Sequence, residues 1–169
     1  MYFRFLILTV FFWASTLTAQ QFNVSLGSDM KILIFGTDNQ FTSHSASFNF
    51  VTKIEFIDTR NTYFAVGYTY ADLTHSYDAL YVNAGIKYNL LPKLDIIPML
   101  ELGRIARNGP DQAFDVKPLY VQVNIATRYQ FLEKLYIDFA LNFQLARDLP
   151  NRTIRYGGVL SLISPIFTQ

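Results

Sequence analysis

The sequence predicts an all-β fold, an eight-stranded antiparallel up-and-down β-barrel. Three observations lead to this prediction. Apolar and polar side chains alternate along most of the chain, as in LYIDFALNFQL at residues 135–145, and a period of two is typical of a β-strand with one apolar face. The pattern recurs eight times, with no segment of helical period between the repeats. Short and long connections follow each other in turn.

The connections between the expected strands are of two kinds. Tight ones, IDTRNT, LLPK and FLEK, follow the second, fourth and sixth strands, whereas mostly longer and more polar ones follow the first, third, fifth and seventh. An even number of strands with short turns at one end and longer loops at the other is the plan of an outer-membrane barrel. The strands are expected at about residues 21–35, 47–57, 62–71, 79–90, 93–105, 118–131, 135–147 and 154–167.

The composition limits the classes of function. The 169 residues are enough for one domain. Charged residues make up 16% of the chain and aromatic residues 17%, whereas a typical soluble domain has about 25% charged residues. The net charge of +1 gives no electrostatic case for binding nucleic acid. The chain has no cysteine, which excludes disulfides, thiolate chemistry and a lipoprotein anchor.

The N-terminus reads as a cleavable signal peptide. Arg4 supplies a positive charge, residues 5–13 (FLILTVFFW) form an apolar run, and residues 14–19 (ASTLTA) are small and polar. This order is typical of a secretory signal, with cleavage expected after Ala19. The alternative is an uncleaved helical anchor, but the run is shorter than the ~20 residues that a spanning helix needs. We therefore expect a signal peptide at residues 1–19 and a barrel domain at 20–169.

The polar faces of the strands are expected to line the lumen. They carry small residues and a balanced set of charges, which suits the narrow interior of an eight-stranded barrel, where buried charges need partners. The apolar faces are bulky and unbroken, as contact with lipid permits. The alternative is a soluble exported barrel or sandwich that keeps the apolar face inside and binds a lipophilic ligand. The ten charges on the polar faces are Asp29, Lys31, Lys53, Glu55, Lys87, Asp95, Glu101, Arg128, Asp138 and Arg155.

Tyrosines and prolines make two further expectations testable. Tyrosines near the strand ends of the apolar face suit the aromatic girdles of membrane barrels. Pro98 and Pro165 fall inside the fifth and eighth strands, and because proline has no backbone N–H, each predicts a bulge or an interrupted ladder. The girdle tyrosines are Tyr68, Tyr70, Tyr88, Tyr129 and Tyr156.

From about Gln21 to Phe167, the chain resembles the small outer-membrane β-barrel proteins of the OmpA/OmpX type. The architecture carries the resemblance, together with the final strand YGGVLSL at residues 156–162, a glycine followed by spaced hydrophobics. The resemblance implies a Gram-negative outer-membrane location, with the N-terminus in the periplasm and the longer loops outside the cell. It also implies outer-membrane lipid and the barrel assembly machinery as partners, an unidentified extracellular loop partner, and a monomer.

The two histidines, His44 and His75, are the candidates for chemistry, since some small barrels modify lipids. Both fall on predicted external loops, near residues that could supply a nucleophile and an orienting acid: Ser45, Ser76, Asp72 and Asp78. None of these forms a recognisable catalytic motif, and two histidines on separate loops define no metal site. We expect no catalytic, cofactor or metal residues and a non-enzymatic barrel with a side-chain-filled polar lumen. The alternatives are an acyl hydrolase or transferase that uses a loop histidine, and a narrow pore.

Overall fold

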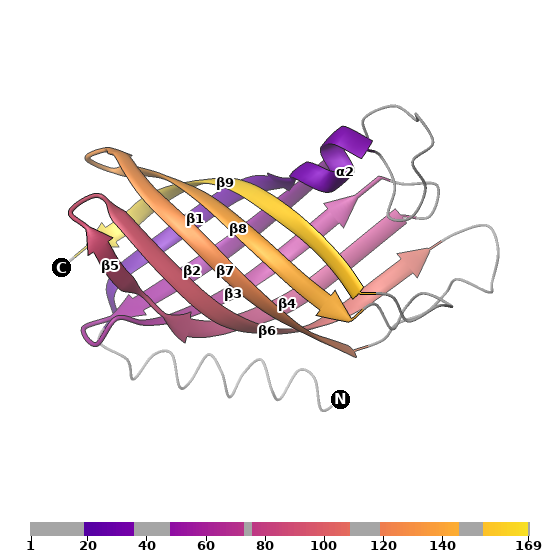
Figure 1. Ribbon diagram of the computed structural model, residues 1–169, viewed down its shortest axis with the longest axis horizontal. Helices are drawn as coiled ribbons and strands as arrows, with labels where there is room; N and C mark the ends of the chain where they lie inside the picture. Colours follow the sequence, from indigo (N-terminus) through magenta and orange to yellow (C-terminus); the bar gives the residue numbers. More distant parts are fainter. Residues whose placement is uncertain (1–18, 36–47, 73–75, 109–118, 146–153, 169) are drawn as a thin grey trace.

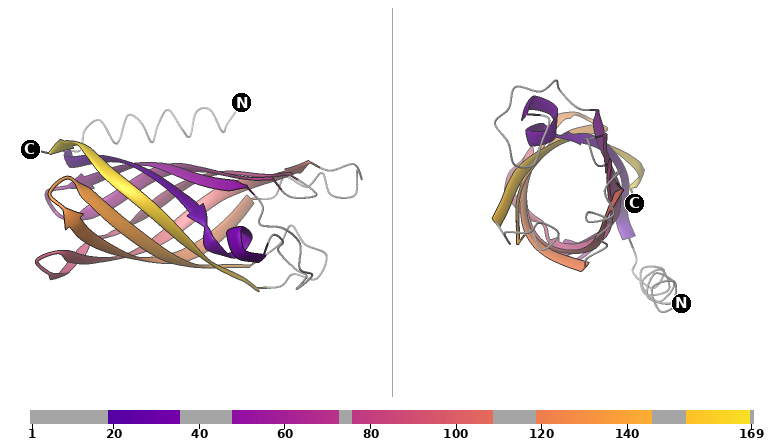
Figure 2. Two further views of the ribbon diagram at one scale, coloured as in Figure 1. Left: turned by 90° about the horizontal axis from the view of Figure 1, so that it is seen from above. Right: turned by 90° about the vertical axis from the view of Figure 1, so that its right-hand side faces the viewer.

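The structure of the protein is a computed structural model that describes residues 19–35, 48–72, 76–108, 119–145 and 154–168. The described chain folds into β-strands that close around a central axis, with one short helix at an end of the barrel (Figures 1 and 2). The elements in chain order are β1 (Ala19–Asp29), α2 (Met30–Phe35), β2 (Asn49–Asp58), β3 (Thr62–Ala71), β4 (Ser76–Ile86), β5 (Tyr88–Leu91), β6 (Leu94–Asn108), β7 (Leu119–Leu132), β8 (Leu135–Leu145) and β9 (Ile154–Thr168).

Each strand pairs antiparallel with its neighbours in the chain, and β1 pairs with β9 to close the ring. The short β5 continues β4 along the same edge of β6. Counted as one interrupted strand, β4 and β5 bring the number of strands around the barrel to eight. The predicted fold is confirmed. The tight turns, the start of β1 and the end of β9 lie at one end of the barrel, here called the turn end; the strands that lead into residues 73–75, 109–118 and 146–153 point to the other, the loop end (Figure 1).

Both prolines disturb the sheet as predicted. On one side of β6, pairing with β4 ends at Gly85↔Met99 and resumes with β5 at Tyr88↔Ile96. Pro98 lies in this gap. Because it has no backbone N–H to donate, the fourth strand of the barrel is divided into β4 and β5. On the β1 side of β9, the register shifts between Phe22↔Phe167 and Asn23↔Pro165, which is a bulge beside the second proline.

Residues 30–35 were expected to end the first strand, and this prediction is wrong because they form the helix α2. The Asp29 carboxylate caps the helix, since its Oδ1 accepts hydrogen bonds from the backbone N–H of Lys31 (2.8 Å) and of Ile32 (3.2 Å). The Asn49 side chain holds the preceding backbone, because its Oδ1 accepts from the Asp29 N–H at 2.6 Å and its Nδ2 donates to the Asp29 carbonyl at 3.2 Å.

The consequence of α2 is that its apolar residues do not extend the outward face of β1. Ile32 turns inward and is buried against Val51, Tyr81 and Tyr120 among other lumen residues, whereas Leu33 and Ile34 remain exposed. The Lys31 ammonium lies 5.1 Å from the centre of the Tyr156 ring on β9. Among the described residues, no helix is long and apolar enough to cross a membrane.

Candidate functional site

The outward face of the barrel is apolar on every strand. Large hydrophobic side chains are exposed on every strand except β3, whose outward apolar residues are half-buried, and Leu26, Leu119 and Tyr156 are each more than 60% exposed. A soluble protein rarely exposes a contiguous apolar surface of more than a few hundred Å². The apolar faces therefore point outward as predicted, and the alternative of a soluble barrel with an apolar cavity is wrong.

The expected tyrosines lie near both ends of this face. Tyr88 and Tyr129 are exposed at the turn end, where they pair with the first residues of β6. Tyr156 is 65% exposed near the start of β9, at the loop end. Tyr68 and Tyr70 pack beside Phe50, with ring centroids 5.9 Å and 5.7 Å from that of the phenylalanine. These positions match two aromatic girdles.

The lumen contains a central network of four buried charges, here called the partition: Lys53, Glu55, Arg128 and Asp138. The Lys53 ammonium lies 3.3 Å from Glu55 and 3.4 Å from Asp138. The Arg128 guanidinium lies 2.9 Å from Glu55 and 3.4 Å from Asp138. Each base thus contacts both acids, and all four side chains are at most 6% exposed. Two positive and two negative charges neutralise each other, as buried charges require.

Neighbouring side chains complete the partition. The Tyr63 hydroxyl donates a hydrogen bond to Glu55 at 3.0 Å, and the Asn23 amide donates to the same carboxylate at 3.3 Å. The Arg128 guanidinium lies 5.9 Å from the centre of the Tyr63 ring. Buried Ile57, Ile97 and other apolar residues pack around Tyr63 on the turn-end side. Side chains therefore fill the middle of the lumen, as is usual for eight strands.

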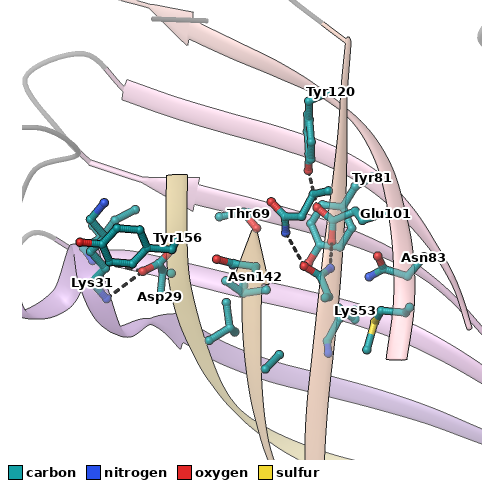
Figure 3. A pocket seen from close by; sticks show the side chains of 18 residues that line it. Asp29, Lys31, Lys53, Thr69, Tyr81, Asn83, Glu101, Tyr120, Asn142 and Tyr156 are labelled. Atoms are coloured by element: carbon teal, nitrogen blue, oxygen red, sulfur yellow. Dashed lines mark hydrogen bonds between the residues drawn. The ribbon is translucent and has the colours of Figure 1, made fainter. Parts of the chain in front are cut away.

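A cavity of about 80 Å³, here called the loop-end cavity, lies on one side of the partition (Figure 3). Lys53 and Glu101 line it, together with amide side chains of β4, β7 and β8. Glu101 is 5% exposed, and its carboxylate accepts hydrogen bonds from the Tyr120 hydroxyl at 2.6 Å and from the Asn124 amide at 2.9 Å. Gln122 in turn donates to the Asn124 carbonyl oxygen at 2.7 Å.

Two glycines allow tyrosines to lie flat against the wall of this cavity. Gly67 faces Tyr81 across β3 and β4, and Gly103 faces Tyr120 across β6 and β7. A Cβ atom at Gly67 would lie 2.3 Å from the Tyr81 ring, and one at Gly103 would lie 2.5 Å from the Tyr120 ring. The absence of a side chain at each glycine therefore places the tyrosine rings, and through Tyr120 it also positions the donor to Glu101.

A second cavity of about 240 Å³ lies at the turn end. Its lining includes Lys87 and Asp95, whose charged groups are 3.8 Å apart and less than one-fifth exposed, and also Arg128. Lys53 lines the first cavity and Arg128 the second. The ion pairs that join these two bases to Glu55 and Asp138 therefore separate the two cavities.

The structure brings together most of the predicted lumen charges. Seven of the ten lie on lumen-facing strand positions that line a cavity or form the partition, and Lys87, between β4 and β5, lines the turn-end cavity. Lys31 also lines the loop-end cavity, but from α2 rather than from a strand. The side chain of Arg155 lies outside the described residues. The sequence interpretation had not singled out Tyr63, Tyr120 and Asn124, although their alternation places them on the same faces.

The candidates for chemistry are only partly described. His44, His75 and Ser45 lie outside the described residues, as does the side chain of Ser76. Asp72 is exposed beyond the end of β3. Asp78 was expected in a loop, but it lies on β4, where its carboxylate accepts a hydrogen bond from the Tyr68 hydroxyl. Within the described ranges, no three His, Cys, Asp or Glu side chains come together as a possible metal site.

Comparisons with solved structures support the fold. No family model and no curated protein matches the chain. Ail of Yersinia pestis, in a phospholipid bilayer nanodisc, aligns with a TM-score of 0.59 at 8% identity over 87% of this chain and 99% of Ail. The N-terminal barrel domain of Pseudomonas aeruginosa OprF aligns with a TM-score of 0.56 at 12% identity, over 88% and 98% of the two chains.

A designed transmembrane β-barrel is also similar, with a TM-score of 0.54 at 12% identity over 88% of this chain and 98% of the design. At such low identity these likenesses concern the fold alone. All three structures are transmembrane barrels, as is expected for a closed sheet with an apolar outer face. The protein thus has the fold of the small outer-membrane β-barrels, which the sequence resemblance predicted.

Proposed function

We propose that the protein is a non-enzymatic integral outer-membrane barrel with a closed lumen, which supports the envelope or contacts partners through its external loops. The outward apolar face and its two tyrosine girdles support the membrane location. The loops would face the outside of the cell and the turn end the periplasm, as the resemblance implies. A monomer inserted by the barrel assembly machinery remains part of this proposal.

The observation that carries the proposal is the partition. Four charged side chains cross-link β2, β7 and β8 through the middle of the lumen, and every one of them is almost fully buried. An ion that crossed the barrel would have to break several of these contacts and strand a charge. The apolar residues around Tyr63 block the space beside them. The geometry thus supports a structural barrel more strongly than a pore.

Single-channel recording in planar bilayers tests this proposal. The unchanged protein should show no steady conductance. A double variant, Arg128→Ser with Asp138→Ser, keeps the net charge but removes half of the partition, and it should conduct. The matched control is Lys87→Ser with Asp95→Ser, which removes a base and an acid at the turn end and should stay silent. Steady conductance of the unchanged protein would contradict the closed lumen.

The non-enzymatic part of the proposal needs a separate measurement. Mass spectrometry of envelope lipids from cells with and without the protein should give the same acyl profiles. A change in acylation that disappears in the His44→Ala or the His75→Ala variant would establish a lipid-modifying enzyme instead.

A further inference from the structure

Glu101 is the buried carboxylate that the partition does not neutralise. Among the described residues, the ion pairs join Lys53, Lys87 and Arg128 to other acids, and none includes Glu101. In the described structure, the donors to its carboxylate are neutral side chains: the Tyr120 hydroxyl and the amide groups of Asn124 and Asn83. Neutral donors reduce the free-energy cost of burying an ion but do not balance its charge.

Lys53 is a base that lines the same cavity as Glu101, but its ammonium already pairs with two other acids. It lies 3.3 Å from Glu55 and 3.4 Å from Asp138. Those two acids also hold Arg128, so the four charges of the partition sum to zero. The partition therefore has no positive charge left over to balance Glu101.

An unpartnered oxygen lies directly across the sheet from Glu101. Asn83 on β4 is the cross-strand partner of Glu101 on β6, and side chains at such positions are neighbours on one face. Asn83 is 2% exposed, and its Oδ1 has no hydrogen-bond donor among the described residues. Figure 3 shows both side chains at the same end of the loop-end cavity. A carboxylate and an amide oxygen without a donor are the ligands that hard cations prefer.

The size and composition of the cavity limit the ligand. Its volume of about 80 Å³ exceeds the ~30 Å³ that one water occupies in the liquid, so an ion and a water molecule fit together. Among the described residues, no group of three His, Cys, Asp or Glu side chains offers the ligand set of a divalent metal. One carboxylate balances one positive charge.

We propose that the loop-end cavity binds a small monovalent cation, Na⁺, K⁺ or ammonium, through the Glu101 carboxylate and the Asn83 carbonyl oxygen. Thr69 and Asn142 also line the cavity and carry further oxygen atoms. Asp29 and Lys31, at the junction of β1 and α2, line it as well, and as one acid and one base they add no net charge to the cavity.

Thermal unfolding in zwitterionic detergent micelles tests the site. Solutions of LiCl, NaCl, KCl, ammonium chloride and N-methyl-D-glucamine chloride are compared at equal ionic strength, so that screening is constant. The large organic cation cannot enter the cavity. At least one small cation should raise the Tm of the unchanged protein relative to it, by about 3 °C for each tenfold rise in concentration above the dissociation constant.

Two isosteric variants separate the site from general charge effects. Glu101→Gln removes the proposed ligand charge and should abolish the dependence of Tm on the small cation. Asp95→Asn removes the same charge from the turn-end cavity and should keep that dependence. A Tm that does not distinguish the cations would overturn the proposal, because Glu101 would then be neutralised by a proton. Equal behaviour of the two variants would also overturn it.

A measurement on the unchanged protein covers the case in which Glu101→Gln does not fold. ¹⁵N-labelled ammonium chloride is added to the protein in micelles, and nuclear Overhauser effects from the ammonium protons are recorded. Contacts to the side-chain amides of Asn83 and Asn124 are expected. Ammonium signals that show no contact with lumen residues at saturating concentration would contradict the site.

Discussion

Two regions of the lumen, the partition and the loop-end cavity, stabilise buried charge in different ways. In the partition, Glu55 and Asp138 each contact two bases within 3.4 Å. In the loop-end cavity, Glu101 is held by neutral hydroxyl and amide donors. The charges of the partition sum to zero, whereas Glu101 places one negative charge beside the cavity. The difference teaches that a balanced composition does not make each buried charge balanced where it lies.

The largest expected effect comes from removing an acid of the partition. Asp138→Leu strands the charges of Lys53 and Arg128 and should lower the free energy of unfolding by about 4 kcal/mol, since breaking a buried ion pair costs about 3–5 kcal/mol. Urea unfolding in detergent micelles measures the loss. The control, Asp95→Leu, breaks a longer and less buried pair with a single base and should cost less than Asp138→Leu. Equal losses would mean that the partition is solvated.

A matched pair of substitutions compares the partition and the loop-end cavity directly. Glu55→Gln leaves two bases short of an acid and should cost about 3 kcal/mol. Glu101→Gln, measured in N-methyl-D-glucamine chloride, should cost less than about 1 kcal/mol, because glutamine still accepts a hydrogen bond from Tyr120 or Asn124. Urea unfolding of both variants at one ionic strength gives the comparison. A greater loss of unfolding free energy for Glu101→Gln than for Glu55→Gln would mean that Glu101, and not Glu55, is the acid paired with a buried base.

The wall of the loop-end cavity gives a smaller effect. Gly67→Val places side-chain atoms where the Tyr81 ring lies, since even a Cβ would be 2.3 Å from that ring. Overpacking of this kind costs about 2 kcal/mol. The same change combined with Tyr81→Ala should recover part of the loss, as seen by urea unfolding. A loss that the second substitution does not reduce would place the strain in the backbone.

The smallest effect is expected at the cap of α2. Asp29→Ala removes the acceptor for two backbone N–H groups and should cost about 1 kcal/mol. Asp29→Asn keeps an acceptor oxygen, so its cost should be only a few tenths of that of Asp29→Ala. Secondary chemical shifts of residues 30–35 show whether the helix persists. Helical shifts that are unchanged in Asp29→Ala would show that α2 does not depend on the cap.

The sequence was sufficient for the faces of the barrel and insufficient for its pairings. A period of two fixes which side of a strand each residue occupies, so Glu55 and Asp138 could be assigned to the lumen. Their partners depend on the register across several strands: Glu55 and Arg128 are 73 residues apart and meet only when the barrel closes.

The helix α2 shows the opposite failure, a local pattern overridden by distant contacts. Met30, Ile32 and Ile34 alternate as they would in a strand. The cap at Asp29 depends on Asn49, 20 residues away, whose side chain holds the end of β1, and Ile32 gains burial in the lumen. Neither contact is visible as a periodicity, because both depend on the closed fold.

The departure of α2 also has a consequence for the seam where the first and last strands meet. Pairing between β1 and β9 ends at Asp29↔Val159, whereas β9 begins five residues earlier, at Ile154. Among the described strands, none pairs with this part of β9 on its β1 side. A bulge beside Pro165 interrupts the other end of the seam. The seam therefore lacks regular pairing at both ends, and we expect the backbone amides there to exchange with solvent earlier than those of an uninterrupted strand pair.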